Sequence, residues 1–136
     1  MSADISDVRV ALASALRVIP GMQVSAWQMA NATPPCAQIT RGPVEYDQAM
    51  HGGVHRPNFT VTAYVALVSD QGAQRLLDRY LAADGDLSVK QALEADTTLG
   101  GLVQDLHVTG ATGEQPYARD QGGPVLGSDW SVEVWL

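Results

Sequence analysis

The segment Asn58-Phe-Thr-Val-Thr-Ala-Tyr-Val-Ala-Leu-Val68 decides the fold class of this chain. Large apolar residues alternate along it with threonine, tyrosine and alanine, which is the two-residue period of a β-strand rich in β-branched and aromatic side chains. Towards its end both faces become apolar, so we expect a central strand. The fold is therefore built on a sheet, and the neighbours of this strand must come from the rest of the chain.

Shorter strand-like stretches lie on both sides of this segment. They are bounded by proline and glycine, which interrupt regular structure. Arg41-Gly-Pro43 is predicted to separate two of them, and residues 113–123 are expected to form a loop before the last. We predict strands over residues 23–29, 36–40, 44–46, 106–112 and 125–136.

The N-terminal region has the pattern of an amphipathic helix. Apolar residues recur there at spacings of three and four, which places them on one helical face. We expect this helix over residues 4–18, with Ser2 or Asp4 as its cap and Pro20-Gly21 as its stop. The apolar residues of the pattern are Ile5, Val8, Leu12, Leu16 and Ile19.

Two further helices are predicted after the central strand. Ser69 or Asp70 is expected to cap the first, and Gly85 to close it. Ser88 followed by Gln91 matches a capping box, so a short helix is predicted over residues 89–95. A tight or 3₁₀-like connection follows over residues 97–104.

Helices and strands are interspersed here without strict alternation. This order favours an α/β protein of the α+β type, with an antiparallel or mixed sheet and two to three helices packed on one face. Residues 1–136 are expected to form a single domain. Residues 47–57 have no periodicity and contain Gly52-Gly53, so we predict a long mobile loop there.

Composition narrows the possible functions. Eight basic residues against 15 acidic ones give a net charge of −7, which disfavours a nonspecific grip on nucleic acid but suits a surface past which DNA moves. Cys36 is the only cysteine, so an internal disulfide is excluded. We find no apolar run long enough for a membrane span and no export signal, and we expect synthesis in a cytoplasm.

The pair His51 and His55 is the most suggestive chemical cluster. Two imidazoles four residues apart could share a metal, with Glu45 or Asp47 as a third ligand. A small metal-dependent enzyme using these histidines is therefore an alternative. The intervening glycines disfavour a helix, however, and the chain has neither a Gly-x-Ser-x-Gly nor a phosphate-binding loop. We expect no enzyme, no metal site and no cofactor.

Two segments resemble the tail terminator proteins of long-tailed bacteriophages (siphoviruses), especially those of actinobacterial hosts. They are Ser88-Val-Lys-Gln-Ala-Leu-Glu-Ala-Asp-Thr-Thr-Leu-Gly-Gly-Leu-Val-Gln-Asp-Leu-His-Val-Thr-Gly110 and Leu126-Gly-Ser-Asp-Trp-Ser-Val-Glu-Val134. The resemblance implies a structural subunit of the virion tail or neck. Six copies would form a ring that caps the tail tube, ends its polymerisation and offers a surface for head-tail joining.

Partners follow from the same resemblance. They are further copies of the chain, a tail tube protein and a head-tail connector protein, while DNA passes through the ring without specific binding. A head-tail connector (neck) subunit or a tail tube subunit is the alternative within this structural class. As contact residues in and beside the 47–57 loop we predict Tyr46, Met50, His51 and Arg56.

Overall fold

The structure is a computed structural model that describes residues 4–27, 35–46, 56–67, 71–118 and 124–136. Three helices and six strands lie within these ranges. In chain order they are α1 (Ile5–Leu16), β1 (Gln23–Ser25), β2 (Cys36–Glu45), β3 (Arg56–Leu67), α2 (Gln71–Leu81), α3 (Val89–Glu94), β4 (Asp105–Ala111), β5 (Gln115–Tyr117) and β6 (Val125–Trp135).

All six strands belong to one sheet, with the order β1-β2-β3-β6-β4 and with β5 also paired to β6. β1 runs parallel to β2, and the other pairs are antiparallel, so the sheet is mixed. Residues 58–67 of the predicted strand lie in β3, between β2 and β6, so its predicted central position is confirmed, and Val68 lies outside the described residues.

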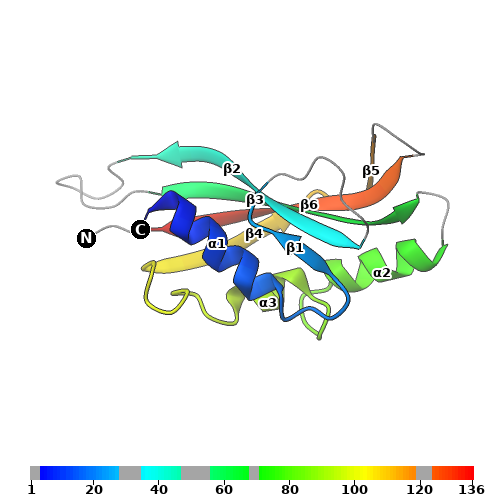
Figure 1. Cartoon of the computed structure of the whole chain (residues 1–136), viewed down its shortest axis with the longest axis horizontal. Helices are drawn as coiled ribbons and strands as arrows, with labels where there is room; N and C mark the ends of the chain where they lie inside the picture. Colours follow the sequence, from blue (N-terminus) through cyan, green and yellow to red (C-terminus); the bar gives the residue numbers. More distant parts are fainter. Residues whose placement is uncertain (1–3, 28–34, 47–55, 68–70, 119–123) are drawn as a thin grey trace.

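The three helices lie on one face of the sheet, which confirms the predicted α+β arrangement (Figure 1). The core fills the space between the two layers, because alternate strand residues and one stripe of each helix point into it. Its members include Val8, Leu12 and Leu16 of α1, Phe59, Val61 and Ala63 of β3, Leu77 and Tyr80 of α2, Leu93 of α3, and Trp130, Val132 and Val134 of β6.

α1 begins and ends close to the predicted positions. Asp4 is the N-cap, and its Oδ1 accepts a hydrogen bond from the Ser6 backbone N at 2.9 Å. The helix ends at Leu16, and Gly21 then takes a positive φ of 78°. A left-handed backbone of this kind favours glycine, so the predicted stop is explained by residue chemistry.

The predicted break at Arg41-Gly-Pro43 is wrong, because β2 is one strand from Cys36 to Glu45. The register to β3 shifts between Arg41 and Val44, so a bulge absorbs the two intervening residues. β1 pairs with β2 only as far as Gln38. Pro43 therefore lies where β1 is absent, and its missing N–H removes no hydrogen bond to that strand.

Two predicted loops also need correction. β3 begins at Arg56, so Arg56 and Pro57 belong to a strand and not to the loop predicted over 47–57. Residues 47–55 of that loop lie outside the described ranges. The loop predicted over 113–123 contains the short strand β5, which pairs with the first residues of β6. Three residues are too few for a periodic signal, and the pairing with β6 defines this strand.

The helix after β3 ends before its predicted stop. α2 finishes at Leu81, and Gly85 lies in the connection to α3, with φ of 109°. The predicted caps Ser69 and Asp70 lie outside the described residues.

The predicted cap of α3 is confirmed, with one difference in detail. Ser88 Oγ accepts from Gln91 N at 3.0 Å and donates to Ala82 O at 2.6 Å. In a capping box the Gln91 side chain would accept from the Ser88 N–H. Here Gln91 Oε1 accepts from Gly85 N at 3.0 Å instead. The Gln91 side chain therefore holds the turn that leads into the helix.

β1 is shorter than predicted, since it ends at Ser25.

None of the described helices combines the length and the apolarity that a membrane crossing requires.

Candidate functional surface

The sheet face opposite the helices carries a polar cluster where β6 ends. Arg56, at the start of β3, lies beside Glu133 and Trp135 near the end of β6. Its Nη1 is 3.5 Å from Glu133 Oε1, and its guanidinium lies 5.0 Å from the centre of the Trp135 ring. The β3–β6 register explains this contact, because Asn58 pairs with Glu133 and Arg56 is two residues nearer to Trp135.

Tyr46 lies at the same end of the sheet. It follows β2 directly and is 67% exposed, and Glu45 before it pairs with Arg56. Of the four predicted contact residues, Tyr46 and Arg56 are thus brought to one end of the sheet. Met50 and His51 lie outside the described residues. We call Tyr46, Arg56, Glu133 and Trp135 the end cluster.

The end cluster combines the aromatic rings of Tyr46 and Trp135 with the guanidinium of Arg56. The Glu133 carboxylate partly neutralises the charge of Arg56. Arginine stacked on tryptophan keeps its flat face in a fixed position while its N–H groups reach a carboxylate. Such a surface is suited to packing against another protein, since aromatic and arginine side chains carry much of the binding energy at protein interfaces. None of its groups is arranged as a nucleophile with a base.

The proposed metal ligands cannot be placed together. His51, His55 and Asp47 lie outside the described ranges, while Glu45 lies in β2. Within the ranges that the structure describes, no group of three histidine, cysteine, aspartate or glutamate side chains could hold a metal.

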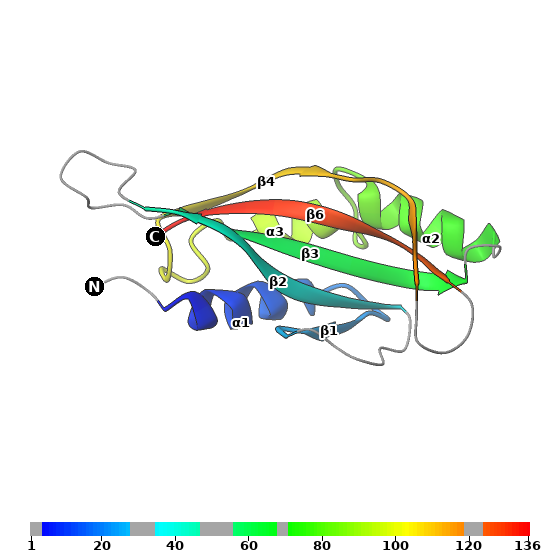
Figure 2. The ribbon, with the colours of Figure 1, turned by 90° about the horizontal axis from the view of Figure 1, so that it is seen from above.

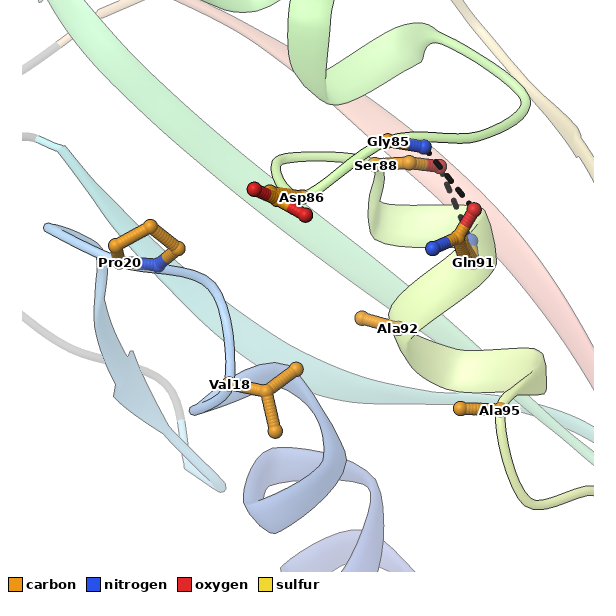
Figure 3. Close-up of a pocket in the computed structure, with 8 residues that line it drawn as sticks. All are labelled: Val18, Pro20, Gly85, Asp86, Ser88, Gln91, Ala92 and Ala95. Atoms are coloured by element: carbon orange, nitrogen blue, oxygen red, sulfur yellow. Dashed lines mark hydrogen bonds between the residues drawn. The ribbon is translucent and has the colours of Figure 1, made fainter.

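A second feature of the surface is a hollow of about 430 Å³ between the end of α1 and α3. Figure 3 shows Val18 and Pro20 on one side of it and Ala92 and Ala95 on the other. Gly85, Asp86, Ser88 and Gln91 complete the lining. The Ser88 hydroxyl is buried and engaged in the α3 cap, so it is not an activated nucleophile. The hollow therefore provides a surface of mixed polar and apolar character that includes Asp86.

A third cluster lies on the helix-free face near the start of β6, and no local sequence pattern indicates it. Tyr117 of β5 packs edge to face on Tyr64 of β3, with ring centres 5.2 Å apart. Thr62 Oγ1 donates to Asp129 Oδ1 at 2.7 Å. Burial raises the pKa of both tyrosines, and the negative charge of Asp129 raises them further. Both hydroxyls therefore stay protonated at neutral pH and serve packing.

Cys36 lies opposite Tyr64 in the β2–β3 register. It is fully buried, and this burial raises the pKa of its thiol to about 11. Because the thiolate is the reactive form, this cysteine is chemically inert in the folded protein.

No protein-family model matches the sequence, and no curated protein matches it.

Proposed function

We propose that this chain is a structural subunit of a bacteriophage tail: a tail terminator that forms a homo-oligomeric, six-membered ring on the end of the tail tube. The ring stops tube growth and provides the surface for head-tail joining. The chain acts by assembly and not by catalysis.

The observation that carries this proposal is the spatial relation of the two segments that resemble tail terminators. Residues 88–110 form the cap of α3, α3 itself, the turn after it and most of β4. Residues 126–134 lie in β6, to which β4 is paired from Asp105 to Ala111. The two segments are separated in sequence but adjacent in the fold. The resemblance therefore concerns one continuous structural unit, which is less easily explained by chance than two unrelated matches.

The shape and charge of the subunit also support assembly. The three helices of the described residues cover one sheet face, and in this part of the chain no helix covers the other face (Figures 1 and 2). A ring of identical subunits needs two different surfaces that meet head to tail. The end cluster and the hollow beside α3 are two such surfaces on one molecule. The net charge of −7 suits a ring through which DNA passes, because like charges prevent the backbone from adhering.

A tube-growth assay tests this function. Purified tail tube protein is allowed to polymerise with and without the chain, and tube lengths are measured by electron microscopy. We expect the chain to bind tube ends and to stop elongation at substoichiometric amounts. A tail tube subunit would instead form tubes by itself, and a connector subunit would leave tube length unchanged.

A contact variant makes the assay specific. Tyr46→Ser removes the exposed ring of the end cluster, and we expect it to weaken capping. Val10→Ser is the matched control, because Val10 is also an exposed apolar side chain, 45% accessible, but lies on α1. If Tyr46→Ser caps tubes as well as wild type, Tyr46 does not belong to the contact surface. If tubes keep growing in the presence of wild type, the proposed function is contradicted.

A further inference from the structure

β4 is the outermost strand on its side of the sheet (Figure 2). An outer strand presents backbone N–H and C=O groups on which another strand can pair. Along this edge, Leu106 N donates to Asp105 Oδ1 at 2.9 Å, and Val108 N donates to Glu94 Oε2 at 3.0 Å. Two carboxylates thus occupy the positions that the carbonyl groups of an incoming strand would take. We call Asp105 and Glu94 the edge cap.

The Glu94 carboxylate is held in place from both sides. Its Oε1 contacts Lys90 Nζ one helical turn earlier, and its Oε2 is 3.0 Å from His107 Nδ1. The side chain is only 21% exposed, and the Ser88 cap fixes the helix that carries it. A carboxylate oriented in this way loses little further entropy when it binds the strand edge, so it competes effectively with another strand.

The partner that fits this edge is the β4 strand of a second copy. In an antiparallel pair centred on Leu106, Asp105 of each copy lies directly opposite His107 of the other. Asp105 and His107 are both exposed. A ring N–H of His107 can donate to the Asp105 carboxylate across such a pair, and the two-fold symmetry produces this contact twice.

We propose that the edge cap keeps β4 from pairing with the β4 strand of a second copy. An edge-to-edge dimer is a closed, two-fold contact, so it would withdraw subunits from any head-to-tail assembly. The inference goes beyond the proposed function and does not depend on it, because the cap acts on the free subunit whatever the final assembly is.

The double variant Glu94→Ala/Asp105→Ala tests the cap. Its dimer fraction is measured by native mass spectrometry at neutral pH over a concentration series. We expect its dimer to be about tenfold or more tighter than that of wild type, because two edge amides in each copy become available for strand pairing. These backbone hydrogen bonds outweigh the loss of the contact between Asp105 and His107. The control is Asp7→Ala/Asp78→Ala, which removes the same charge from exposed positions on α1 and α2. A folded double variant with the wild-type mass distribution would overturn the proposal.

Disulfide trapping tests the register. Glu94→Ala/Asp105→Cys is mixed with Glu94→Ala/His107→Cys under mild oxidation, and we expect a disulfide-linked heterodimer because the two new cysteines lie opposite each other. Cys36 is buried and does not interfere. If the double variants do not fold, Asp105→Ala and Glu94→Ala are measured singly. Each is expected to raise the dimer fraction by a smaller factor, and wild-type behaviour of both would equally overturn the proposal.

Discussion

Arg9 is the residue whose role is least visible in the sequence. It is buried in α1, with Nε 2.5 Å from Ala26 O and Nη2 2.7 Å from Ile39 O. The β1–β2 ladder ends at Gln38, and the Arg9 guanidinium binds the carbonyl of the next β2 residue, Ile39. Burial lowers the pKa of Arg9, and the charge of Arg41 lowers it further. A helix side chain thus completes the hydrogen bonding of a strand edge.

Replacing Arg9 by methionine should destabilise the fold. Methionine keeps much of the side-chain volume but leaves the carbonyl groups of Ala26 and Ile39 without their donor. We expect a loss of about 2 kcal/mol in the free energy of unfolding, measured by urea denaturation. Arg17→Met is the control, since Arg17 is exposed, and it should change stability by less than about 0.5 kcal/mol. Equal stability of the two variants would contradict this role of Arg9.

Gly127 is required by close packing and not by backbone conformation. A Cβ atom at this position would meet Ala63 O closer than real contacts permit, and would also meet the Tyr117 ring at 3.1 Å. Gly127→Ala should therefore cost about 3 kcal/mol or prevent folding. Gly110→Ala, where a Cβ meets nothing within 4 Å, should remain folded with near-wild-type stability. Thermal melting of both variants compares them directly.

At the scale of elements, Glu94 joins α3 to β4 and gives this junction a pH dependence. Partial burial opposes its ionisation, but Lys90, the Val108 amide and His107 outweigh that effect and lower the pKa of Glu94 below its usual value of 4.5. A lowered folded-state pKa contributes stability that is present above pH 4.5 and is lost as the pH falls through the folded value. The junction should therefore weaken in acid.

Glu94→Gln tests this linkage. The amide oxygen can still accept from Val108 N, but the charge is gone. We expect the variant to be less stable than wild type at pH 7 and to lose less stability than wild type between pH 5 and pH 3, as measured by urea midpoints across that range. Parallel pH profiles for the two proteins would contradict the assignment.

The secondary structure was predictable where the signal is local. The alternation that predicts β3, the Asp4 cap and the Ser88 cap all depend on neighbouring residues. The structure contains both caps and a strand over residues 56–67. The continuity of β2 through Gly42-Pro43 was not predictable, because it depends on the bulge against β3 and on the absence of β1 beside Pro43. β5 was missed because three residues carry no period.

The candidate surface was predictable only in part. Tyr46 and Arg56 are predicted as contact residues because Tyr46 lies beside the predicted 47–57 loop and Arg56 lies within it, and the β2–β3 register brings both to one end of the sheet. Glu133 and Trp135 complete the end cluster from a strand about 80 residues later in the chain, and only the β3–β6 pairing reveals them. Contacts between distant strands depend on register, which a single sequence does not state.

At the scale of the whole molecule, the two-layer fold of the described residues places α1, α2 and α3 on one side of the sheet, and its surface includes the helix-free sheet face, the end cluster and the hollow beside α3. These surfaces lie on different parts of one subunit. Contacts between unlike surfaces lead to rings when the rotation closes. The ring proposal therefore requires that copies of the chain associate through unlike surfaces, such as the end cluster and the hollow beside α3. It does not require pairing between the edge strands β4 of two copies.

Native mass spectrometry of the purified protein across a concentration series, with negative-stain images of the same samples, tests the central claim most directly. The samples are measured alone and with tail tubes. We predict a six-membered ring with a central hole, formed in solution or on tube ends. A monomer at every concentration, with no ring on the tubes, would contradict the account.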